Sequence, residues 1–322
     1  MRYAYRMQPP GMIGDVVAGL TLLSALGPTR AGELFLGECA DGRCAVKLLR
    51  PEVCGDRERV DRALAAAKAV GALDHRGIEF VIEAGWDGDR AYLLGDLMPG
   101  TPVAKLVARR AFEPDTASAI IHLAAEALAA AHLAGVHHLA LDPVLLHVGF
   151  ASDRVLVRDF GLGELAPASE AYRAPEQRAA ASAVGAAADV YALGCIAYEL
   201  LCGVPPPVDG PAPPVRVAVP DVSSRVEELL RRMLAPDPAA RPAMADVRDE
   251  LAGKRRAAVG APPAPAPPRE PPRARLPDVA EVMAALAVEG SDEPTPGPGP
   301  PPEPPEPPKP ADPSGGSHGS GV

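Results

Sequence analysis

Three short segments of the chain carry residue types that handle phosphate groups. Two spaced glycines lie in GPTRAGEL (27–34), a lysine ends AVK (45–47), and an aspartate opens DFG (159–161). A glycine turn lets the backbone come close to a ligand, and a carboxylate can hold a hard cation together with water and phosphate oxygens. Taken singly, the glycines are typical of a hairpin turn and the lysine of a solvated strand edge. Their order along the chain is what indicates a common site.

The elements that would position these segments divide the chain into a β-rich part and a helical part. Strands are predicted from short apolar or β-branched stretches separated by turns, at 20–27, 32–40, 43–49, 80–87 and 91–97. Helices are predicted at 57–72, 116–135, 189–203, 226–234 and 243–253. Asp115 is the predicted N-cap of the second helix, and Ser224 forms a capping box with Glu227 ahead of the fourth. The fold class is therefore α+β, with a small β-rich lobe followed by a larger helical lobe.

Composition and charge exclude several classes of partner. The net charge is −10 and the isoelectric point about 5.3, so we expect no nucleic-acid or anionic-membrane surface. Five cysteines without a C-x-x-C pair fit reduced thiols better than disulfides or a zinc site. The apolar stretch at 12–27 is interrupted by Asp15 and by glycines, which argues against a membrane span. A cytoplasmic protein is expected.

Composition changes sharply near residue 255. We therefore expect an N-terminal extension at 1–16, a folded domain at 17–254 with lobes meeting near 97–98, and a disordered tail at 255–322. Between Pro294 and Pro313, 12 of 20 residues are proline, which a helix or sheet ladder cannot accommodate. A short helix is predicted at 278–289, either transient or partner-binding, and the proline run either spaces domains or docks to a groove-type domain.

From about residue 17 to 252 the segments resemble, in order and spacing, the eukaryotic-type (Hanks-type) Ser/Thr protein kinases. The resemblance implies a bilobal kinase fold that binds ATP and Mg²⁺. It places Gly27 and Gly32 at two glycines of the loop that covers the phosphates, with Thr29 in place of the middle one. It makes Lys47 the phosphate-contacting lysine and Asp159 the Mg²⁺ ligand. The same resemblance adds Asp96 to the nucleotide-binding residues.

The resemblance also shows where polar groups are lost. The helix glutamate that pairs with the lysine falls on Ala66, so Lys47 is expected to turn to Asp159 and compete with metal. The family's H-R-D-L-K-P-x-N-I is similar to HLALDPVLL at 138–146. Ala140 stands at the catalytic aspartate and Leu145 at the asparagine that binds a second metal ion. Asp142 replaces the lysine of this motif; the alternative is that it serves as a displaced base.

Other matched residues imply structural roles. His138, Phe160 and Asp189 match positions that support an internal stack joining the lobes, with Gly161 completing DFG. Glu176 in A-P-E and Arg241 match a buried ion pair of the large lobe. Residues 204–222 are broken by prolines where the family has an extra helix.

Three hypotheses follow. The first is a pseudokinase, a degenerate bacterial-like member of the family that binds protein partners and retains ATP as a possible ligand. The second is a weakly active Ser/Thr kinase that uses Lys47 and Asp159, because phosphoryl transfer relies mainly on positioning and electrostatics. The third is an adaptor that works through its proline-rich tail.

Overall fold

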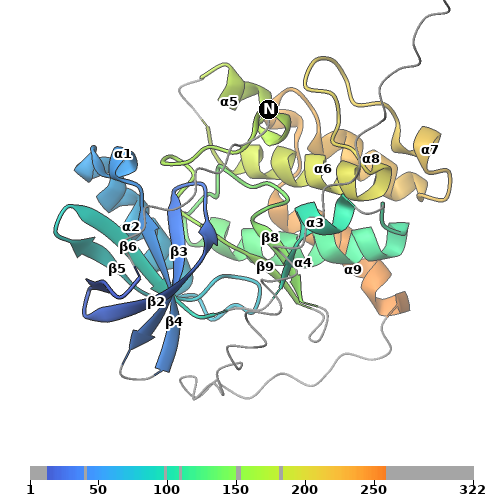
Figure 1. Cartoon of the computed structure of the whole chain (residues 1–322). Helices are drawn as coiled ribbons and strands as arrows, with labels where there is room; N and C mark the ends of the chain where they lie inside the picture. Colours follow the sequence, from blue (N-terminus) through green and yellow to red (C-terminus); the bar gives the residue numbers. More distant parts are fainter. Residues whose placement is uncertain are drawn as a thin grey trace, which may run out of the picture.

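The chain folds into two lobes that pack against each other at a junction called the cleft. The computed structural model describes residues 13–39, 42–97, 100–108, 111–149, 154–180 and 184–258. Figure 1 shows the β-sheet and α2 (blue to teal) forming one lobe, and helices coloured green to orange forming the other. The predicted α+β fold, with a small β-rich lobe and a larger helical lobe, is confirmed. The predicted helix at 278–289 and the proline-rich segment lie outside the described residues.

The small lobe is built on an antiparallel sheet with the strand order β1-β2-β3-β4-β6-β5. Its strands are β1 (Val16–Val17), β2 (Leu20–Pro28), β3 (Gly32–Cys39), β4 (Gly42–Leu49), β5 (Val81–Asp87) and β6 (Arg90–Gly95). Alternation along β4 sends Val46 and Leu48 to a cluster on one face of the sheet. Lys47 points to the opposite face, where its register partner on β6 is Leu93. The period of two thus sends Lys47 to the face that α2 covers.

Helix α2 (Arg57–Gly71) follows the one-turn helix α1 (Pro51–Cys54) and covers this face. The Asp56 carboxylate accepts a hydrogen bond from the Arg59 amide, which caps the helix start. Its buried face is made of small and branched residues at helical spacing: Val60, Ala63, Leu64, Ala67 and Val70. Because Ala63 and Ala67 on that face are small, the helix can lie close to the segments beneath it.

The large lobe has α4 and α6 at its centre. Its helices are α3 (Val103–Val107), α4 (Pro114–Leu133), α5 (Pro175–Arg178), α6 (Ala186–Cys202), α7 (Val215–Ala218), α8 (Ser224–Met233) and α9 (Met244–Ala258). Its strands are β7 (Thr101–Pro102), β8 (Leu146–Gly149) and β9 (Arg154–Val157), and its 3-10 turns are η1 (Glu170–Tyr172) and η2 (Pro238–Ala240). Helix α4 is long and apolar enough to cross a membrane, but most of it is buried in the core, packed against α6 and α9.

Several predicted helix boundaries need correction. Helix α4 begins at Pro114, so Asp115 lies within its first turn and is not its N-cap. Proline is favoured at the first helical position because an N–H there would have no partner within the helix, so its absence costs nothing. Helix α8 is capped by Ser223, whose hydroxyl accepts from the Val226 amide, and not by Ser224. Helix α9 continues past residue 254 to Ala258. The proline-broken segment at 204–222 contains the single-turn helix α7.

Candidate functional site

Lys47, the lysine that the resemblance places on the phosphates, is buried between the lobes. Strand β4 carries Lys47, which is 4% exposed, and its Nζ contacts the Asp159 carboxylate just beyond β9. A second carboxylate oxygen, Oε2 of Glu79, lies 3.8 Å from the same Nζ. Lys47 has therefore turned to Asp159, as the sequence predicts for a chain with alanine at the helix position.

Glu79 is a cleft residue that sequence reasoning missed. It lies between α2 and β5, and its Oε1 accepts hydrogen bonds from Arg158 Nε at 3.0 Å and Nη2 at 2.7 Å. Its Oε2 accepts from the Asp159 amide at 3.1 Å. Burial acts to raise the pKa of Glu79, but the Arg158 guanidinium and the Lys47 ammonium outweigh it and hold that pKa well below its usual range. The available signal was a lone carboxylate within the apolar run IEFVI at 78–82.

Glu79 thus helps to hold Asp159 in an unusual backbone conformation. Asp159 has φ = 63°, in the left-handed region that a non-glycine residue rarely adopts, and Gly161 follows with φ = 80°. A Cβ on Gly161 would lie 2.7 Å from the Ala67 amide nitrogen and 2.9 Å from the Ala66 Cβ. The alanine at position 66 therefore packs close to DFG, and the second carboxylate beside Lys47, after that of Asp159, comes from Glu79.

Three charged groups of this network line a void the size of a water molecule. Its lining includes Lys47, Glu79, Asp159 and Phe160, and the space open to the centre of a water is about 10 Å³. The two cations and two anions among Lys47, Glu79, Arg158 and Asp159 balance one another. A phosphate that binds Lys47 must compete with carboxylates already in contact with it.

The glycine-rich loop is a tight turn between β2 and β3. The Thr29 amide donates to the Gly32 carbonyl at 2.8 Å, and the Gly32 amide donates to the Thr29 hydroxyl at 3.0 Å. Gly27 has φ = 136°, and a Cβ on Gly32 would lie 1.7 Å from the Leu48 carbonyl oxygen. Turn geometry and close strand approach therefore require these glycines, and two amides of the loop already have partners within the turn.

The catalytic-loop segment contains a buried carboxylate at Asp142. Asp142 is 1% exposed; its Oδ1 accepts from the Val144 amide at 3.0 Å, and its Oδ2 forms an ion pair with Arg30 from the glycine-rich turn. Ala140 and Leu145 are buried beside it, at 3% and 7% exposure. A methyl group and an isobutyl group therefore occupy the positions where the resemblance places the base and the second metal ligand.

The oxygen donors suit one divalent ion at most. Asp159 supplies one carboxylate, of which one oxygen contacts Lys47, and Leu145 supplies no donor. Among the described residues no three His, Cys, Asp or Glu side chains form a metal-binding group. Because Mg²⁺ accepts one carboxylate when phosphates and water complete its shell, Asp159 could hold one ion with a nucleotide. Asp96 is half-buried directly after β6, on the segment that leads to the large lobe.

The residues predicted to join the lobes lie together. The His138 and Phe160 rings are 5.0 Å apart, and His138 Nε2 is 2.8 Å from the Arg158 carbonyl oxygen. Asp189 on α6 accepts from the amides of His138 at 2.8 Å and Leu139 at 2.7 Å. The His132 ring nitrogen Nε2 also lies 2.8 Å from the Asp189 carboxylate. Burial acts to raise the pKa of Asp189, but the hydrogen bonds with the His132 ring and the His138 amide help to hold that pKa below its usual range. This stack and its anchor give His138 and DFG a structural role.

A second buried pair fixes the large lobe. Arg241 donates to Glu176 through Nη1 at 2.7 Å and Nη2 at 2.8 Å, and its side chain is fully buried. Its remaining donors reach the carbonyls of Ala235, Ala187 and Pro236. Burial acts to raise the pKa of Glu176, but the hydrogen bonds from Arg241 outweigh it and lower that pKa.

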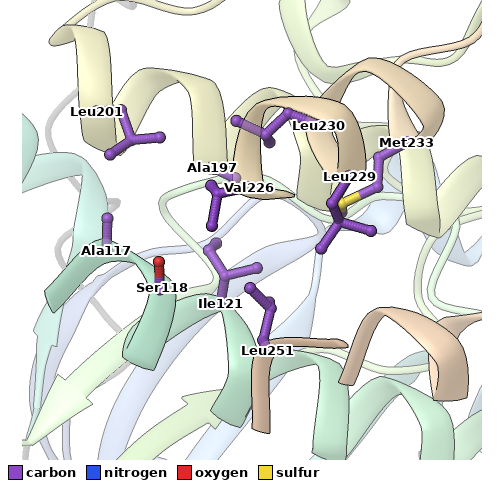
Figure 2. Close-up of a pocket in the computed structure, with 10 residues that line it drawn as sticks. All are labelled: Ala117, Ser118, Ile121, Ala197, Leu201, Val226, Leu229, Leu230, Met233 and Leu251. Atoms are coloured by element: carbon purple, nitrogen blue, oxygen red, sulfur yellow. The ribbon is translucent and has the colours of Figure 1, made fainter. Parts of the chain in front are cut away.

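The large lobe contains a small apolar void between α4, α6, α8 and α9. Figure 2 shows Ile121, Leu201 and Met233 pointing into it, and the Ser118 hydroxyl at its edge donates to the Pro114 carbonyl. The volume of this void, counted as the space that the centre of a water molecule can occupy, is about 20 Å³. An apolar void of this size is a packing defect of the core, because it is too small for an organic ligand.

The chain is similar to known proteins in sequence and in fold. A model of the protein kinase domain matches residues 23–250. The Ser/Thr-protein kinase PkaB of Streptomyces coelicolor is 35% identical over 242 residues, which cover 67% of this chain and 58% of that protein. The Ser/Thr-protein kinase PknA of Mycobacterium tuberculosis is 30% identical over 228 residues, which cover 62% of this chain and 52% of that protein.

A solved structure agrees with these sequences. The crystal structure of the Mycobacterium tuberculosis PknI kinase domain superposes with a TM-score of 0.66 at 29% identity, and covers 75% of this chain and 98% of that domain. The chain spans 58% of PkaB and 37% of Pkn1 from Myxococcus xanthus, so the likeness is to the kinase domains of longer proteins.

Proposed function

The chain belongs to the protein kinase family, and from that premise we propose that it is a pseudokinase, a signalling or scaffolding module of the cytoplasm that binds protein partners. The observation that carries the proposal is Ala140, whose buried methyl group stands where an active kinase needs an aspartate to accept the substrate hydroxyl proton. A methyl group cannot take that proton. Leu145 and Asp142 support the same proposal, because neither residue supplies what the family uses there.

The proposed module keeps a limited capacity for nucleotide. Lys47 and Asp159 are in contact, Gly27 keeps its positive φ, and the family typically binds ATP with Mg²⁺. Against this, Lys47 has two carboxylates beside it and two amides of the glycine-rich turn already have partners. We therefore expect weak ATP binding that Mg²⁺ strengthens modestly through Asp159.

The second candidate is a weakly active Ser/Thr kinase. Asp159 favours it, because its left-handed backbone presents an intact DFG carboxylate next to Lys47. Asp142 would be the base in this candidate, but both of its oxygens have partners, Arg30 and the Val144 amide. A hydroxyl substrate would have to displace the guanidinium before proton transfer.

The test is phosphate transfer by the full chain. ATP is titrated calorimetrically with and without Mg²⁺, and incorporation of labelled phosphate into the chain and a general protein substrate is followed. The pseudokinase predicts no incorporation above that of an Asp159→Ala variant. Incorporation that Lys47→Ala and Asp159→Ala both abolish would establish the weak kinase instead.

A restored variant sharpens this test. Ala140→Asp combined with Asp142→Lys and Leu145→Asn returns the family's residues at three positions of the loop. Transfer that appears in the restored protein and is absent from the native chain would assign the loss to these positions. The adaptor alternative is tested separately with a fragment that holds residues 256–322 alone. Capture of a partner by this fragment would favour the adaptor, and loss of capture would contradict it.

A further inference from the structure

Arg30 connects the glycine-rich turn to the large lobe. Its guanidinium forms an ion pair with Asp142, and its Nη1 donates to the Pro167 carbonyl at 2.8 Å. Its own carbonyl accepts from the Arg50 side chain. One residue of the small lobe thus contacts two separate segments of the large lobe, while its side chain stays 22% exposed.

Asp142 is the fixed member of the pair. Its side chain is 2% exposed, and the Val144 amide holds its Oδ1 at 3.0 Å. A carboxylate that is buried and held by the backbone has little freedom to move, so the flexible arginine comes to it. Leaving such a carboxylate buried without its cation is costly.

A guanidinium recognises carboxylate and phosphate through the same fork of N–H donors. Arg30 extends from the turn that, in the proposed nucleotide-binding role, would lie over the phosphates. A nucleoside triphosphate entering beneath that turn brings several negative charges toward Arg30. It competes for Arg30 with the carboxylate that already holds it.

We propose that Arg30 is a phosphate-binding residue of this cleft and that Asp142 is its internal competitor. Without nucleotide, the ion pair holds the turn against the large lobe. When a triphosphate binds, Arg30 exchanges Asp142 for a phosphate oxygen. This inference rests on the nucleotide binding in the proposed function. It assigns Asp142 the role of lowering triphosphate affinity, in contrast to the role of a displaced base.

The experiment is a double-mutant cycle on the full chain at one fixed salt concentration. ATP and adenosine are titrated calorimetrically into the native protein, Arg30→Gln, Asp142→Asn and the double variant. Asp142→Asn should raise ATP affinity about tenfold, the effect of one lost charge-pair competitor, and Arg30→Gln should lower it. In the double variant, Asp142→Asn should bring no gain in ATP affinity, because the arginine that this substitution would release is absent. Adenosine has no phosphate, so its affinity should be the same in all four proteins.

The coupling separates exchange from simple repulsion. If Asp142→Asn raises ATP affinity equally with and without Arg30, the carboxylate merely repels phosphate and the proposal is overturned. If adenosine binds but Arg30→Gln leaves ATP affinity unchanged, Arg30 is not a phosphate ligand and the proposed nucleotide binding still stands. If neither ligand binds to any of the four proteins, the proposed nucleotide binding is refuted, and so is the exchange that rests on it.

Folding is controlled within the same set. Asparagine keeps an oxygen for the Val144 amide, so Asp142→Asn is the least disruptive change at that position. Arg30→Lys provides a second variant that keeps the charge and loses the fork. It should give an ATP affinity between those of the native protein and Arg30→Gln. Affinity equal to that of Arg30→Gln would contradict a role for the charge.

Discussion

Replacing Glu79 by glutamine tests whether this carboxylate holds the cleft residues together. In the native protein Glu79 accepts two hydrogen bonds from Arg158 and one from the Asp159 amide, with Lys47 Nζ at 3.8 Å. Glutamine keeps the shape and one acceptor oxygen but removes the charge. Asp159 is then the one carboxylate of this network left to balance the charges of Lys47 and Arg158.

The magnitude follows from the burial of the network. Removing one partner of a buried ion pair typically costs about 3–5 kcal/mol. Because the Glu79 side chain is 14% exposed and glutamine retains some hydrogen bonds, we expect the free energy of unfolding to fall by about 2–3 kcal/mol near pH 7. Urea denaturation followed by circular dichroism measures this difference.

The pH dependence gives the prediction a second signature. A carboxyl whose pKa is lower in the folded state adds stability above its unfolded pKa, about 4.3 for glutamate. That stability is lost as the pH falls from there toward the folded-state pKa, which for Glu79 lies well below the usual range. The difference between native and Glu79→Gln proteins should therefore be constant above about pH 5.5 and shrink below about pH 4.3.

A matched control separates this effect from the effect of removing an exposed carboxylate. Glu58 forms an ion pair with Arg62 on α2, and its side chain is 89% exposed. Glu58→Gln should leave the unfolding free energy unchanged within error, because exposed pairs contribute little. A Glu79→Gln effect no larger than the control, or one that stays the same down to pH 3, would refute the role given to Glu79.

Three further predictions concern the rest of the domain. Arg241→Ala should lower the free energy of unfolding by about 3–5 kcal/mol in urea denaturation, because it leaves Glu176 buried without its cation; a loss below about 1 kcal/mol would contradict the buried pair. Gly32→Ala should destabilise by about 3 kcal/mol, since its Cβ would meet a strand carbonyl at 1.7 Å, whereas the exposed Gly55→Ala should be near neutral in the same assay. Burial raises the pKa of Cys195 to about 12, so mass-spectrometric mapping should find this thiol labelled only after denaturation, and rapid labelling in the native protein would show the helix to be open.

The sequence by itself determined the fold class and the chemical losses. Strand and helix periods repeat locally, so a few residues are enough to recognise the alternation along β4, the buried face of α2 and the apolar α6. The replacement of a catalytic aspartate by Ala140 is equally direct once the segment is matched, since a methyl group has no acceptor whatever surrounds it. Helix starts were read less well, as at Asp115 and Ser224, because proline and a neighbouring serine competed for the same position.

Only the tertiary structure decided which further groups join Lys47 and Asp159 in the cleft. Glu79 and Asp159 are 80 residues apart, and Arg30 reaches Pro167 across 137 residues. These contacts depend on how loops of two lobes approach one another. Loops have no period from which their side-chain partners can be inferred. The loss of the helix glutamate was therefore visible in the sequence, while its replacement by Glu79 and the pairing of Asp142 with Arg30 required the folded chain.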